Sequence, residues 1–215
     1  MRPTLAALTL ITLAACGAPG GAAAADDDEM VPVAATVSAA PTAPAPTAPD
    51  ETDAIMLAAA GSACKAEDYK AFFDAMIASV AVRRTYSAAK IDVVRYDAAR
   101  TPYTAIETKK IAASDYSDFP IKMVDHYRQS VVPARPGDTD EHVILQFNQS
   151  QSNQISVEWT RVHYDGKSEG GDDLGQAVDL DGQPYDAGGR VDGQLLLYPT
   201  ETCWQLVADN RYERP

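Results

Sequence analysis

The stretch KAEDYKAFFDAMIASVAVRRTY, residues 65–86, has the clearest helical periodicity in this chain. Its large apolar side chains recur every three to four residues, which is the spacing of one buried face of an α-helix. Acidic residues lie in the first turn and two arginines lie near the end, as the helix dipole favours. The sequence therefore predicts one long amphipathic helix that packs on the rest of a domain. The residues of its apolar face are Tyr69, Phe72, Phe73, Met76, Ile77 and Val80.

After Ser87 the pattern changes to alternating apolar and polar residues, rich in β-branched and aromatic side chains, which is typical of half-buried strands. We interpret the Gly- and Asp-rich segment 165–193 as an excursion from the sheet, because its Asp-Gly pairs favour turns. One N-terminal helix followed by a mostly antiparallel, curved sheet defines an α+β domain, with the helix covering one sheet face. We expect strands at 90–96, 103–109, 121–127, 142–148, 155–164, 193–198 and 203–208.

The N-terminal sequence Leu13-Ala14-Ala15-Cys16 follows Arg2 and an apolar run that is too short to span a bilayer. This arrangement resembles the lipobox of bacterial lipoproteins. The resemblance implies that residues 1–15 are a signal peptide and that Cys16 carries the lipid. Gly17, in place of Asp, implies a lipid anchor in the outer membrane, facing the periplasm, if the source is Gram-negative. The alternative is an ordinary secretory signal with an unrelated cysteine at its cleavage site.

The segment 16–49 is rich in Ala and Pro, carries an acidic cluster and contains no basic residue. Such a composition has too few large apolar side chains to offset chain entropy, so we expect a disordered linker. A short helix is expected at 50–61, and residues 62–215 are expected to form a single α+β domain. Acyl chains on the first residue of the linker would bind the membrane with ~0.8 kcal/mol per buried CH₂.

The chain is acidic, with 18 Lys plus Arg, 31 Asp plus Glu and a formal net charge of −13. This charge argues against a nucleic-acid partner, because binding of a phosphate backbone needs clustered cations. We therefore expect the membrane, through the lipid on Cys16, and an envelope protein or a small-molecule ligand as partners. The sequence indicates no cofactor.

Three cysteines are present, and assigning Cys16 to the lipid leaves Cys64 and Cys203. In an exported chain, two remaining cysteines are expected to form a disulfide. Closing so long a loop would stabilise the fold by roughly 4–5 kcal/mol through loss of unfolded-state entropy, less any strain. Two separately buried thiols are the alternative.

The order of one helix and a meandering sheet resembles the cone-shaped folds of the nuclear transport factor 2-like superfamily, which includes SnoaL-like proteins. The residues that carry the resemblance are the early pair Phe72-Phe73 and the stretch Cys203-Trp204-Gln205-Leu206-Val207 in a last strand. A cystatin-like sheet wrapped on one helix fits the same pattern. The resemblance covers roughly residues 64–212.

Two short stretches resemble a catalytic and a metal-binding motif, but each lacks other residues that its motif requires. Residues 166–170 match G-x-S-x-G, but all three histidines precede Ser168, whereas a hydrolase elbow needs its His after the Ser. Residues 179–182 suggest a calcium loop, but Pro184 stands where that loop needs Gly and Arg190 where it needs Glu. Histidines are isolated from one another, so the sequence predicts no metal site.

The predicted strand 155–164 changes character along one face, where apolar residues are followed by Trp159, Arg161 and His163. In a cone-shaped domain this gradient predicts a pocket, with Trp159 and Phe73 as wall residues and the charged side chains at its mouth. His163 beside Asp125 would be a candidate acid–base pair for catalysis. The alternative is a strand whose end emerges into solvent.

From these observations we expect an acyl-anchored cell-envelope lipoprotein whose tethered domain binds a protein partner or a small ligand without catalysis. The alternative from a different class is a periplasmic SnoaL-like enzyme that uses acid–base chemistry in a cone-shaped pocket. A third interpretation is a structural tether between two envelope layers.

Overall fold

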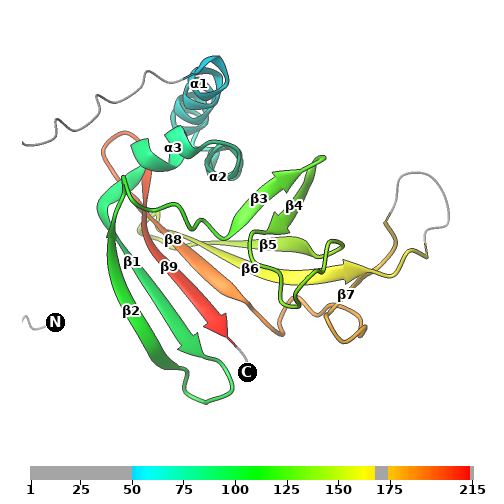
Figure 1. Cartoon of the computed structure of the whole chain (residues 1–215). Coiled ribbons are helices and arrows are strands. Elements are labelled where there is room, and N and C mark those ends of the chain that lie inside the picture. Colours follow the sequence, from blue (N-terminus) through cyan, green and yellow to red (C-terminus); the bar gives the residue numbers. More distant parts are fainter. Residues whose placement is uncertain (1–49, 168–173, 214–215) are drawn as a thin grey trace, which may run out of the picture. The chain divides into compact units, whose positions relative to one another are not determined.

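The computed structural model describes residues 50–167 and 174–213 (Figure 1). The predicted signal peptide, the lipidation site Cys16, the linker 16–49 and Ser168 lie outside the described residues. Within these described residues, three helices come first and nine strands follow. The helices are α1 (Glu51–Lys65), α2 (Tyr69–Ala78) and α3 (Val80–Thr85); the strands are β1 (Ser87–Asp97), β2 (Thr104–Ala112), β3 (Ile121–Val124), β4 (Tyr127–Ser130), β5 (His142–Gln149), β6 (Ile155–Tyr164), β7 (Ala177–Val178), β8 (Gly193–Pro199) and β9 (Trp204–Glu213).

The prediction of one long helix over residues 65–86 is wrong, because this segment contains two helix starts. Glu67 adopts a positive φ of 54° after α1, and the Asp68 side chain then accepts a hydrogen bond from the backbone N–H of Ala71 at 3.0 Å. Ser79 is extended, and its hydroxyl accepts from the first turn of α3. Asp and Ser are favoured N-caps because their oxygens satisfy free N–H groups. Three short helices result, and the first runs past the expected 50–61.

The main sheet has the strand order β2-β1-β9-β8-β6-β5, with β7 paired to β6, while β3 and β4 form a separate hairpin. All neighbouring pairs are antiparallel except β1 and β9, which run parallel. The fold class is therefore corrected: the domain is dominated by a large mixed sheet with three short helices, and no long helix covers it. β1 and β9 are the first and the last strand, so their pairing joins segments that are far apart in the sequence. A short stretch of sequence therefore cannot predict this pairing.

The helices pack on one face of this sheet, which we call the inner face and define by Ile91, Val157 and Leu195. Phe72 and Phe73 of α2 are fully buried there, with ring centroids 5.7 Å from Trp204 and 5.7 Å from Phe147, respectively. Burying one such side chain contributes about 1.5–3 kcal/mol. In Figure 1 the helices lie at one end of the sheet, and β1, β2 and β9 extend beyond them.

The disulfide between Cys64 and Cys203 is confirmed. It joins the end of α1 to the residue before β9 and closes a loop with a sequence separation of 139. It therefore attaches the helices to the sheet covalently. None of the helices in the described part of the chain combines the length and the apolar character needed to cross a membrane.

Candidate functional site

The charged ends of several strands surround a cavity of about 350 Å³ on the inner face. Arg95 comes two residues after Val93 and four after Ile91 along β1, and both of those residues are in the core. Because residues two apart in a strand share a face, the Arg95 side chain lies on the same face of the sheet. Arg95 is paired across the sheet with Glu107 of β2 on one side and with Arg211 of β9 on the other. Lining residues thus come from strands far apart in sequence, together with the segments that flank the β3–β4 hairpin.

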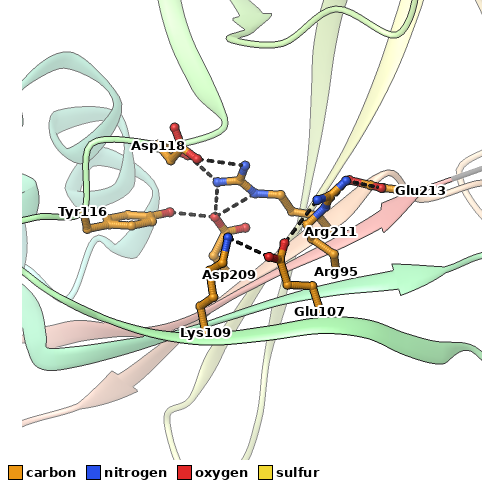
Figure 2. A network of polar contacts seen from close by, with 8 residues as sticks. All are labelled: Arg95, Glu107, Lys109, Tyr116, Asp118, Asp209, Arg211 and Glu213. Atoms are coloured by element: carbon orange, nitrogen blue, oxygen red, sulfur yellow. Dashed lines mark hydrogen bonds and ion pairs between the residues drawn. The ribbon is translucent and has the colours of Figure 1, made fainter.

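An ion-pair network in the lining of the cavity joins β1, β2 and β9 (Figure 2). Arg95 donates to both carboxylate oxygens of Glu213, at 2.5 and 2.6 Å, and to Glu107 at 3.1 Å. Lys109 lies 2.6 Å from the other oxygen of Glu107. These bonds to Glu213 and Glu107 raise the pKa of Arg95, and Lys109 and Arg95 lower the pKa of Glu107. Arg95 and Glu107 are therefore both charged at neutral pH.

A second network is centred on Asp209, whose side chain is completely buried. Its Oδ2 accepts hydrogen bonds from the Tyr116 hydroxyl at 2.8 Å and from the Arg211 guanidinium at 2.7 and 3.0 Å. Arg211 also donates a hydrogen bond to the backbone carbonyl of Asp118. The two residues lie side by side in Figure 2. Burial raises the pKa of Asp209 and also that of Tyr116. This network attaches the segment between β2 and β3 to β9.

The third part of the site is built on β6. Asp192, with a side chain 1% exposed, accepts from the Arg161 backbone N–H at 2.7 Å and from its guanidinium at 3.3 Å. Arg190 donates to the same carboxylate at 2.7 Å. The indole of Trp159 lies against Gly193, where a Cβ would come within 2.4 Å of it, so only glycine fits. The Arg161 guanidinium lies 5.8 Å from the centroid of that ring.

Two buried donors on this wall have no hydrogen-bond partner among the described residues: the indole N–H of Trp159 and the Nε–H of Arg161. Nearly all buried polar groups in proteins are hydrogen-bonded, to protein, to water or to a ligand. Both residues line the cavity. Both donor atoms are themselves buried, so neither is exposed to the cavity in this arrangement.

The structure brings together only some of the residues predicted from sequence. Trp159 and Arg161 line the cavity, whereas Phe73 is fully buried in the core. His163 is hydrogen-bonded to Asp138 at 2.8 Å and is not a lining residue of the cavity. Asp125 lies in the turn between β3 and β4 with a φ of 45°. The proposed acid–base pair of His163 and Asp125 is therefore not joined by a hydrogen bond.

Sequence reasoning missed the residues that β9 contributes, namely Asp209, Arg211 and Glu213. The predicted strand ended at 208, and a bulge lies at that point: Leu196 pairs with Ala208, but Leu197 pairs with Leu206. An extra residue moves the following side chains to the opposite face. The alternating charges from Asp209 to Glu213 were the available signal for a continued strand.

No group of three or more His, Cys, Asp or Glu side chains is placed to hold a metal ion within 50–167 and 174–213. At the turn considered for calcium, Asp179 instead accepts from the backbone N–H groups of Asp181 and Gln183 at 2.9 and 2.8 Å. Neither a family model nor a curated protein matches this chain.

Proposed function

We propose that this protein is an acyl-anchored cell-envelope lipoprotein whose sheet domain binds a small molecule, without transforming it, in the cavity of the inner face. The observation that carries the proposal is the cavity itself, with a volume of about 350 Å³ and a lining of paired charges. Small-molecule sites in proteins commonly measure about 300–1,000 Å³ and carry a few precisely placed polar groups.

The lining is held in place before any ligand arrives. Arg95 is fixed by hydrogen bonds to Glu213 and Glu107. Arg211 is bonded to the buried Asp209, and Arg161 is bonded to the buried Asp192. Side chains that are already ordered lose little entropy when a ligand binds, and this favours affinity. The paired charges therefore support a binding role.

The geometry favours binding over the enzymatic alternative. An acid–base mechanism was expected to use His163 with Asp125, but His163 bonds to Asp138 outside the cavity lining. The carboxylates that line the cavity are all paired with arginine or lysine side chains. They are Glu107, Asp118, Asp192 and Glu213. No observation among the described residues therefore favours a general base in the cavity.

The location of the domain is proposed from the sequence. The lipobox-like stretch ending at Cys16 supports a lipid anchor, and Gly17 supports the outer membrane of a Gram-negative cell. The disulfide between Cys64 and Cys203 is consistent with an oxidising compartment. With a net charge of −13, the protein would contact the membrane through its acyl chains, and nucleic acid is not a proposed partner.

The experiment is purification of the full-length acylated protein from its own cells, followed by mass spectrometry of retained small molecules. The test variant is Val132→Trp, because Val132 lines the cavity and is 66% exposed, so a larger side chain obstructs the mouth without disturbing the core. The control is Val80→Trp on α3, which is 46% exposed and away from the cavity.

We expect the wild type and Val80→Trp to retain the same compound and Val132→Trp to lose it. Retention of no compound by the wild type would contradict the proposal, as would equal retention by all three proteins. Recovery of only a protein partner after crosslinking in cells would favour the alternative of protein binding.

A further inference from the structure

We propose that the ligand of this cavity is an uncharged, hydroxyl-rich molecule of the saccharide type, held by Arg161 and Trp159. The inference rests on the proposed function, because it assumes that a small molecule occupies the cavity. It adds the chemical class of that molecule and the residues that select it.

The charges of the lining are the first argument. Cationic and anionic side chains are equal in number around the cavity, and each cation is already paired with a carboxylate. A ligand with a net charge would compete with an existing pair, and the cost is greatest at the pairs with the buried carboxylates Asp192 and Asp209. The cost is smaller at Arg95 and Lys109, whose side chains are 44% and 58% exposed. An uncharged ligand leaves every pair intact. The cations are Arg95, Lys109, Arg161 and Arg211.

Hydrogen-bonding capacity is the second argument. Each ion pair presents N–H donors next to carboxylate acceptors, and a hydroxyl group can both donate and accept. On the β6 wall, the indole N–H of Trp159 and the Nε–H of Arg161 are buried donors without a partner among the described residues. Both atoms are buried, and the Trp159 indole is packed against Gly193, so these donors reach a ligand hydroxyl only if the β6 wall moves when the ligand binds. A polyol satisfies both kinds of group at once.

The apolar part of the lining is the third argument. Val93, Ile111 and Val131 line the cavity together with the charged groups. A sugar ring has the matching pattern, since its C–H faces suit small apolar patches and its hydroxyl edges suit the ion pairs. A purely apolar molecule would leave the ion pairs unsolvated, so it fits less well.

The experiment measures the affinity of the full-length protein for hexoses that share a ring but differ in charge. The uncharged probes are glucose, galactose and mannose, and the charged probes are glucuronate and glucosamine. Binding is read by calorimetry and by tryptophan fluorescence, because Trp159 lies on the cavity wall while the only other tryptophan, Trp204, lies in the core. We expect at least one uncharged hexose to bind at least tenfold more tightly than either charged one.

Matched variants test the two residues. Arg161→Gln is compared with Arg190→Gln, because both arginines bond to Asp192 but only Arg161 lines the cavity. We expect Arg161→Gln to weaken hexose binding roughly tenfold or more and Arg190→Gln to weaken it clearly less, because Arg190 supports Asp192 but does not line the cavity. Trp159→Phe removes the indole N–H and is expected to weaken binding about threefold to tenfold. Its control is Trp204→Phe, because the Trp204 indole donates to Asn153 at 3.1 Å in the core.

The outcomes separate this inference from the proposed function. Binding of glucuronate or glucosamine in place of the uncharged hexoses overturns the ligand class but leaves a binding cavity. Binding of none of the five sugars also overturns the class, and the retention experiment with Val132→Trp then decides the proposed function independently. Equal losses of binding in Arg161→Gln and Arg190→Gln overturn the role of Arg161.

Discussion

At the residue scale, two buried carboxylates hold the arginines of the cavity. Asp192 and Asp209 have side chains that are 1% and 0% exposed, and they bond to Arg161 and Arg211. Removing one partner of a buried pair leaves an uncompensated charge and costs more than the pair contributes. These carboxylates therefore act as positioning residues for the cavity lining.

Asp209 should make stability depend on pH. Burial raises its pKa more than the bonds from Arg211 and Tyr116 lower it, so the folded protein keeps this proton to a higher pH than the unfolded chain does. Between the unfolded and folded pKa values the folded state binds more protons, and the contribution of Asp209 to stability falls as pH rises. We expect the stability of the wild type relative to Asp209→Asn to be greatest at acid pH and to decline towards neutral pH.

The measurement is urea unfolding of both proteins between about pH 4 and pH 8. Asp118→Asn is the control, because Asp118 belongs to the same network but its side chain is 77% exposed. A difference between wild type and Asp209→Asn that does not vary with pH would show that burial does not perturb this carboxyl group.

At the scale of elements, Ser79 decides how the helices are divided. Its side chain is buried, and its hydroxyl donates to Asp53 of α1 at 2.7 Å while accepting from Ala81 and Val82 at the start of α3. One hydroxyl therefore begins α3 and contacts α1, while the backbone N–H of Ser79 donates to Ala75 at the end of α2. The helical periodicity of residues 65–86 correctly predicts that Phe72 and Phe73 are buried. It fails for Val80, which is 46% exposed because the chain changes direction at Ser79.

Ser79→Ala should destabilise the domain by about 2 kcal/mol, since it removes an N-cap and a hydrogen bond to a charged carboxylate. The measurement is the free energy of unfolding in urea. Ser62→Ala is the matched control, because the Ser62 hydroxyl only donates to the Ala58 carbonyl within α1 and lies at an exposed position. If the two variants lost the same stability, the cap at Ser79 would not hold the three helices together.

At the scale of the whole molecule, the parallel pairing of β1 and β9 creates the site. It places Arg95 beside Arg211 and Glu213, residues separated by more than half of the chain. The disulfide between Cys64 and Cys203 fixes the helices at the start of the same strand. The first and last parts of the domain must therefore meet before the cavity exists.

Cys16→Ala should detach the protein from the membrane but leave the domain folded. The lipid is expected on Cys16, whereas the core and the disulfide begin only at α1, so no folding contact of the described domain depends on the anchor. Membrane fractionation measures attachment, and protection of the Cys64–Cys203 disulfide from reductant measures folding. Gly17→Ala, which leaves Cys16 in place, is the control. Loss of the folded domain in Cys16→Ala would refute the separation of tether and domain.

The sequence by itself predicted that Phe72 and Phe73 are buried, and it identified the disulfide pair. Local periodicity encodes the face on which a side chain lies, and this is why Trp159 and Arg161 were expected on one wall. Only the tertiary structure decided which residues of the chain contact one another. The bulge before Asp209 reverses the alternation of β9, and His163 meets Asp138 in place of Asp125. Such choices depend on register and on pairing between distant segments, which no short window of sequence specifies.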